Sequence, residues 1–169
     1  MYKVGDKIVH PAHGAGIIAA VEYKDVLDEF NSYYVIHLAA QDMRLMVPVR
    51  MAGEIGLRRV ATKKAAKEIL AILSGEAEDL PDDFKERRAH LMARLREGDA
   101  ESLAKVVRDM AARSHAKTYS PTEARLYDQA RGMLSGELAL AQGREVEAAL
   151  ALIESLTAAV HADDAPAHG

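Results

Sequence analysis

The chain has 169 residues, a net charge of −4 and 49% apolar residues, a composition that supports a packed core and excludes global disorder. It contains no cysteine, which excludes disulfide bonds and thiolate metal sites and fits a reducing compartment. No apolar run approaches the roughly 20 residues that span a bilayer. We therefore expect a soluble, cytoplasmic protein with no membrane partner.

Basic charge is concentrated in one part of the chain. Residues 84–131 hold eleven basic and seven acidic residues, whereas residues 132–169 hold one basic and six acidic residues. A net acidic chain is a poor candidate for a simple nucleic-acid binder, but a local basic segment can still contact phosphates. Any contact with DNA is therefore expected from the central segment.

Short segments of β-forming residues dominate the first sixty positions. Residues 4–16 have the pattern of a turn, a strand, a turn and the start of a second strand, and residues 15–23 and 32–38 are apolar and partly β-branched or aromatic. Further turns are expected at residues 25–31 and 41–42, and a final pair of strands at residues 43–49 and 55–58. The pattern predicts a small antiparallel β-barrel of the SH3 or Tudor kind. A barrel this small encloses no ligand cavity, so its function is expected on its surface and edges.

From Thr62 onward the apolar residues recur with the period of a helix. The strongest local signal is Ser120-Pro121-Thr122-Glu123, because Ser at the cap, Pro at the first helical position and Glu three residues after the cap form a capping box. The other expected helix boundaries are caps at Thr62, Asp82 or Asp83, and Asp99, and ends at Ser74, Gly75, Gly98 and Gly143.

These patterns predict an α+β protein of two domains. The small β-barrel spans residues 1–58, an all-α helical bundle spans residues 62–161, and residues 162–169 form a disordered tail.

Three histidines, His10, His13 and His37, are the only candidates for a metal or acid–base cluster. A zincin-type pair needs two histidines on one helical face with a glutamate between them, whereas Pro11 and Gly14 favour a turn here. Phosphate-binding glycine loops and nucleophile motifs are also missing. We therefore predict a protein that is not an enzyme, with no catalytic residue, no metal and no cofactor; an enzyme that uses the three histidines is the remaining class.

A basic run accompanies Phe84 on the second predicted helix and consists of Lys85, Arg87, Arg88, Arg94 and Arg96. In the functional interpretation, Arg87, Arg88 and Arg94 extend to one side and neutralise phosphates without reading sequence. In the alternative, this is a solvated helix face and Phe84 lies in the core. Periodicity alone favours the alternative.

Residues 43–48 are strand-like and end in Pro48. Proline is tolerated on an edge strand, where its missing N–H leaves no ladder bond unmade. An apolar edge can accept a strand from a partner. An ordinary barrel strand that ends at a proline is an equally good interpretation of the pattern.

Several of these motifs resemble, in the same order, those of the bacterial CarD/CdnL transcription factors. The similarity begins at residues 4–16 and continues at residues 43–48 and 55–58. In the helical half, residues 104–110 are similar to the family's A-x-V-V-R-D-L helix, and residues 120–131 to its S-x-x-E-R-x-x-x-x-A-R segment. The likeness covers roughly residues 3–142, and the coincidence of several motifs makes it specific.

The resemblance implies a global transcription regulator that uses both domains. Its Tudor-like domain would bind the β1 lobe of the RNA polymerase β subunit by strand addition, and its helical domain would contact the minor groove at the upstream edge of the transcription bubble. The protein would stabilise the open promoter complex without sequence-specific recognition and without a required oligomer. The implied polymerase-binding residues are Lys24, Arg44, Met46, Val47 and Pro48, and the implied DNA-binding residues are Phe84, Lys85, Arg87, Arg88 and Met92.

One departure from the family pattern concerns the start of the DNA-facing helix. The family has a tryptophan wedge there, in a W-x-R-R pattern, and Phe84 stands at its position. Phenylalanine is an accepted minor-groove wedge, but it lacks the indole N–H and offers less area. Glu86 replaces a common arginine and is expected to repel phosphate. We therefore expect weaker DNA engagement than in members with tryptophan. The alternative function is an adaptor that binds polymerase, or another strand-edge partner, without significant DNA contact.

Overall fold

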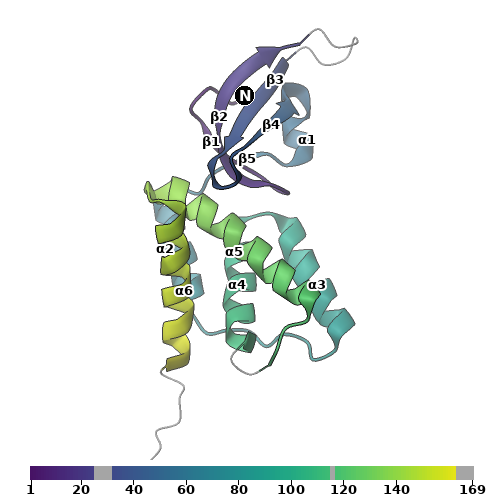
Figure 1. The fold of residues 1–169 in the computed structure, drawn as a ribbon, viewed down its shortest axis with the longest axis vertical. Helices are drawn as coiled ribbons and strands as arrows, with labels where there is room; N and C mark the ends of the chain where they lie inside the picture. The colour runs from purple at the N-terminus through teal and green to yellow at the C-terminus, as the bar shows by residue number, and fades with distance from the viewer. Residues whose placement is uncertain (25–31, 115–116, 163–169) are drawn as a thin grey trace, which may run out of the picture.

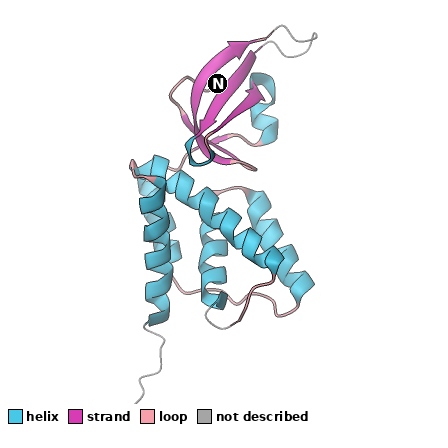
Figure 2. Ribbon diagram, in the orientation of Figure 1, coloured by secondary structure: helices cyan, strands magenta, loops and turns pink. Residues whose placement is uncertain are grey.

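The computed structural model describes residues 1–24, 32–114 and 117–162. A five-stranded sheet comes first in the chain and is followed by a group of helices (Figures 1 and 2). The predicted two-domain α+β class is confirmed. The expected turn at residues 25–31 and the expected disorder of residues 163–169 lie outside the described residues. Helix α6 continues to Ala162, which was predicted to begin the tail.

The sheet is antiparallel throughout and has the order β4-β3-β2-β1-β5. Its strands are β1 Lys7–His10, β2 Gly14–Tyr23, β3 Ser32–Leu38, β4 Met43–Pro48 and β5 Arg58–Arg59. Within the described residues β4 and β5 do not pair with each other, so the sheet is open and the predicted small barrel is not closed.

The open sheet has a local cause in the segment between β4 and β5. A 3-10 turn at Val49–Met51 and helix α1, Ala52–Ile55, occupy most of the chain there, and β5 keeps only two residues, which pair with β1. The predicted final pair of strands is therefore corrected. The predicted turn at residues 41–42 is confirmed: it follows a 3-10 turn, and Asp42 adopts the left-handed conformation with φ 46°.

The sheet buries one face in a hydrophobic core of its own. Alternate residues of neighbouring strands point to this face, as expected for a period of two. Its fully or nearly buried members are Ile8, Ile18, Tyr34, Ile36, Leu38, Val47, Ala52 and Leu57. The hydroxyl of Tyr34 accepts a hydrogen bond from the backbone N–H of Tyr2 at 2.9 Å, which pairs the one polar atom that this aromatic side chain carries.

The remaining helices are α2 Lys63–Leu73, α3 Phe84–Glu97, α4 Ala100–Ser114, α5 Pro121–Gln142 and α6 Val146–Ala162. Their predicted starts are confirmed, because the side chains of Thr62, Asp83, Asp99 and Ser120 each accept a bond from a backbone N–H of the first turn. None of the described helices has the length and apolar character needed to cross a membrane.

Helix α5 is the central element of the molecule. It lies between the sheet and the other helices (Figure 1), and every residue from Met133 to Ala139 is buried. The helical core around it contains Leu91, Leu103, Val107 and Met110 and is separate from the core of the sheet. The predicted domain limits, residues 1–58 and 62–161, stay a prediction.

Candidate interaction surfaces

Strand β4 lies at an open edge of the sheet, since among the described residues it pairs with β3 and with no other strand. Its side chains alternate: Arg44 and Met46 are exposed, Leu45 is half-buried and Val47 is buried. An edge strand presents backbone N–H and C=O groups that another chain can pair with. The edge geometry that the sequence suggested is therefore present.

Four of the five residues predicted to bind polymerase gather at this edge. Lys24 follows β2, and its Nζ lies 3.4 Å from Sδ of Met46, which is 37% exposed. Arg44 and Pro48 share the outward face of β4 with Met46 because they are two residues away from it. We call Lys24, Arg44, Met46 and Pro48 the β4 edge surface. The side chain of Val47, the fifth predicted residue, lies in the core of the sheet, so Val47 is left out of this surface.

Tyr23 is a feature of this region that the sequence interpretation missed. It ends β2, immediately before Lys24, and its side chain is almost fully exposed. Tyrosine is enriched at protein interfaces because it offers a large apolar body and a polar tip. The available signal was its place beside Lys24 at the end of a strand.

Helix α3 carries the second candidate surface. Asp83 caps its first turn by accepting bonds from the N–H groups of Lys85 and Glu86 at 2.9 and 3.0 Å. Phe84, the first residue of the helix, is 41% exposed, so the alternative that buried it in the core is wrong. Met92 is half-buried and packs against the helical core.

The exposed side of α3 is basic around Phe84. Lys85, Arg88 and Arg96 are exposed and form no ion pair with any other residue in the described part of the chain. A helix advances about 100° per residue, which puts these three side chains and Met92 on adjoining positions. We call Phe84, Lys85, Arg88, Met92 and Arg96 the α3 surface.

Arg87 does not belong to the α3 surface, and its predicted DNA contact is corrected. It is only 6% exposed, and its guanidinium pairs with the carboxylate of Glu123 and donates to the carbonyls of Pro81 and Asp82 at 3.0 and 2.8 Å. Burial on its own would raise the pKa of Glu123, but the hydrogen bonds from Arg87 and Ser120 outweigh it and hold that pKa below its ordinary value. Arg87 therefore anchors α3 to α5 as an internal ion pair.

Arg94 is also turned away from solvent, contrary to the expectation that it extends beside Arg88. Its Nη2 donates to Oε2 of Glu78 at 2.8 Å, and its Nη1 lies 3.9 Å from Oδ2 of the buried Asp109. The basic run thus divides into two internal arginines and a set of outward cations.

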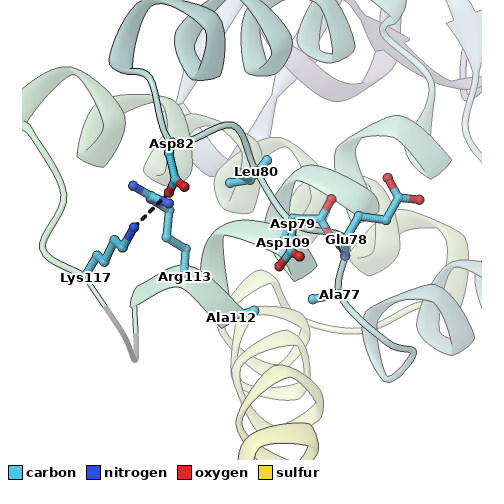
Figure 3. Close-up of a pocket in the computed structure, with 9 residues that line it drawn as sticks. All are labelled: Ala77, Glu78, Asp79, Leu80, Asp82, Asp109, Ala112, Arg113 and Lys117. Carbon is cyan, nitrogen blue, oxygen red and sulfur yellow. Dashed lines mark hydrogen bonds and ion pairs between the residues drawn. The ribbon is translucent and has the colours of Figure 1, made fainter.

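The segment that leads into α3 is fixed to α4 and to the chain beyond it. The backbone N–H of Glu78 donates to Oδ1 of Asp109 at 2.9 Å, and Lys117 pairs with Asp82 at 2.8 Å. Figure 3 shows Arg113 and Lys117 extending toward Asp82 beside a cavity of about 380 Å³ that this segment lines. None of the predicted site residues lines the cavity. The two contacts tie the segment before α3 to α4 and to Lys117.

Glu86 lies on the opposite side of α3 from Arg88. It lies two residues before Arg88, a rotation of about 200° around the helix axis. It is also the third residue after the Asp83 cap, where a negative charge is favourable because of the helix dipole. The repulsion that the sequence suggested is therefore reduced.

Among the described residues, no hydrogen bond or ring contact joins His37 to His10 or His13. The rings of His10 and His13 lie 4.8 Å apart, and burial, helped by the nearby His13, lowers the pKa of His10. His37 lies elsewhere in the sheet domain, with its Nε2 3.7 Å from Oδ1 of Asp42. Over residues 1–24, 32–114 and 117–162 no group of three or more His, Asp or Glu side chains could hold a metal ion.

Comparison with known proteins supplies the identity of the fold. Residues 2–61 match the family model described as CarD-like/TRCF RID domain, and residues 68–154 match CarD, C-terminal domain. "Putative transcription factor YdeB" of Bacillus subtilis (strain 168) is 33% identical over 143 residues, which cover 85% of this chain and 94% of that protein. A sheet domain followed by this helical domain defines a class of transcription factor, which is not a known class of enzyme. The chain belongs to the CarD family, as the sequence motifs indicated.

Proposed function

We propose that this protein binds the β1 lobe of the RNA polymerase β subunit through the β4 edge surface and promoter DNA through the α3 surface. By holding both, it stabilises the open promoter complex. The observation that carries the proposal is that an open sheet edge and an exposed Phe84, flanked by outward cations, lie on different domains. The family resemblance supplies the two partners.

Strand addition suits the β4 edge surface. The backbone groups of an edge strand provide hydrogen bonds, and alternate side chains provide specificity. Arg44 and Met46 project as such alternate side chains, and Lys24 adds a cation beside Met46. A partner strand on the polymerase lobe would extend the sheet next to β4.

Phosphate contact suits the α3 surface. Lys85, Arg88 and Arg96 can neutralise phosphates without reading bases. Phe84 can enter a widened minor groove between partly unstacked bases, as apolar wedges do. Because such a wedge fits only distorted DNA, its binding favours the open state over the closed duplex.

The two contacts support each other. Once one surface is bound, the other acts at a raised effective concentration, so each contact can be weak alone. This accounts for DNA contact by a protein with a net charge of −4.

The experiment that tests the proposal measures the lifetime of open promoter complexes formed by the protein's own polymerase, with and without the protein. We expect the wild type to lengthen the lifetime on several promoters, Met46→Glu to lose capture of the β-subunit lobe, and Phe84→Ala to keep capture but lose the longer lifetime. Val4→Ala, which alters an exposed apolar residue outside both surfaces, is the matched control. An unchanged lifetime with wild-type protein would contradict the proposal.

The adaptor without DNA contact remains the second candidate, favoured by phenylalanine at the wedge position. Arg88→Glu separates the two functions, with Arg144→Glu as the control because Arg144 is exposed and lies off α3. Loss of the effect on transcription with Arg88→Glu alone supports DNA contact. Equal activity of both variants supports the adaptor.

A further inference from the structure

We propose that Arg58 and Glu137 are positioning residues that hold the β4 edge surface and the α3 surface at one fixed distance and orientation. The inference rests on the proposed function for its consequence in transcription, but its structural part stands on the contacts between the two domains.

The contact between the two side chains is a bidentate ion pair. Arg58 belongs to β5 and Glu137 to α5. Nη1 of Arg58 donates to Oε1 of Glu137 at 2.7 Å, and Nη2 donates to Oε2 at 2.8 Å. Two parallel bonds fix orientation as well as distance, which a single contact cannot do.

The same guanidinium reaches a third element. Its Nε donates to the carbonyl of Gly98 at 3.0 Å, and Gly98 ends α3 in the left-handed conformation. One side chain therefore ties the sheet to α5 and to the helix that carries Phe84. Oε1 of Glu137 also accepts the backbone N–H of Ala61 at 3.0 Å, which fixes the segment between β5 and α2.

Glu137 has no solvent-exposed surface, although it is a carboxylate. It follows Met133 by four residues and Leu134 by three, which puts it on the apolar side of α5. Replacing a buried ion pair by apolar residues of similar size is often neutral or stabilising, so stability alone does not explain a charge at this position. A directional pair does explain it, because it selects one arrangement of the two domains.

The other contacts between the sheet domain and the helical domain are less directional. A side chain at Gly14 would meet Met133 at 3.7 Å, and one at Gly136 would meet Ala15 at 3.8 Å, so the backbones approach closely there. Lys7 donates to the carbonyl of Leu140 at 2.9 Å. Apolar packing and a single hydrogen bond from a flexible lysine tolerate small shifts, whereas the bidentate pair does not.

A fixed distance and orientation matter because binding at one surface raises the effective concentration at the other only when the geometry lets both bind together. With the pair broken, each surface keeps its own chemistry, but the two are no longer held at the same separation. We expect the coupling between polymerase binding and DNA binding to fall, and each separate affinity to stay the same.

The test uses the absence of cysteine in the chain. Spin labels on Ala19→Cys and Ala93→Cys, two exposed positions outside both surfaces, report the distance between the sheet and α3 by double electron–electron resonance. We expect one narrow distance in the otherwise wild-type chain and a broad distribution with Arg58→Gln. Arg58→Lys, which keeps the charge and loses the bidentate geometry, is expected to broaden it as well.

Arg59→Gln is the matched control, because Arg59 is the neighbouring residue of β5 and pairs within the sheet domain with Asp6 at 3.1 Å. It is expected to leave the distribution narrow. Circular dichroism checks the fold of every variant, and Arg58→Lys carries the test if Arg58→Gln does not fold. Narrow distributions in the folded Arg58 variants would overturn the inference.

The functional arm compares the same unlabelled variants. Arg58→Gln is expected to keep lobe capture and binding to DNA alone, and to shorten the open-complex lifetime by about tenfold or more. If distances broaden but the lifetime conferred by the protein is unchanged, the positioning role is overturned. If wild-type protein itself has no effect on the lifetime while distances broaden, the proposed function fails and the domain-holding pair stands.

Discussion

Two arginine–glutamate pairs in the described part of the chain, each with a buried glutamate, have different settings. Arg87–Glu123 lies inside the helical domain, where both side chains are at least nine-tenths buried. Arg58–Glu137 joins the two domains, and its arginine keeps 30% of its side chain exposed. The same kind of ion pair therefore has two different roles. The first pair holds a helix within its domain, and the second sets the relative position of the two domains.

The largest effect is expected from breaking the internal pair. Glu123→Ala leaves the buried Arg87 without its carboxylate, so we expect a loss of about 3–5 kcal/mol in the free energy of unfolding, measured by urea denaturation. Asp128→Ala, which removes an exposed partner of Arg131, serves as the control and is expected to change stability by no more than about 1 kcal/mol. A small loss with Glu123→Ala would mean that α3 does not depend on this pair.

The pair between domains is expected to cost less stability when it is broken. In Glu137→Gln the partly exposed guanidinium of Arg58 can turn to water, so we expect a loss of about 1.5–3 kcal/mol by the same measurement. Glu154→Gln, on the exposed side of α6, is the control. A loss as large as that of Glu123→Ala would remove the distinction between the two pairs.

Acid should lower the stability that the Arg87–Glu123 pair contributes to the fold. The folded-state pKa of Glu123 lies below its ordinary value of 4.5, so its contribution to stability is fully present above that value. It is lost as the pH falls through the lowered pKa, because the folded state must then take up the proton. Urea unfolding between neutral and acid pH should show this loss, and Glu123→Gln should show a shallower dependence on pH. If the free energy of unfolding depended equally on pH in the wild type and in Glu123→Gln, the lowered pKa of Glu123 would be contradicted.

The smallest effect separates Arg88 from its buried neighbour. Arg88→Gln should leave the fold intact and lower the slope of log affinity for DNA against log salt by about 0.9, the value for one phosphate contact on duplex DNA. Arg144→Gln should leave the slope unchanged. Fluorescence anisotropy at several salt concentrations measures both. An unchanged slope with Arg88→Gln would remove it from the DNA interface.

Local signals account for what the sequence predicted correctly. The caps at Thr62, Asp83 and Ser120 depend on residues within one turn, so composition at those positions is sufficient. The open sheet was missed because closure depends on whether β5, after α1, is long enough to reach β4. That is a property of the whole segment and not of any strand pattern.

The residues of the candidate site also divide into those that the sequence could predict and those that it could not. Lys24 and Met46 were placed by resemblance, and the sheet brings them together. Arg87 could not be distinguished from Arg88 along α3, because its burial depends on Glu123, thirty-six residues later. Glu137 offered a signal that was not used: a carboxylate on the apolar side of a helix requires a buried partner.

The burial of α5 on every side between Met133 and Ala139 has a consequence for how the protein is made. The sheet domain leaves the ribosome first, but the surface on which it rests belongs to a helix that begins only at Pro121. Domains generally form in order of synthesis, so the sheet can assemble its own core while its support is still missing. The relative orientation of the two domains is therefore decided late, as a property of the finished chain.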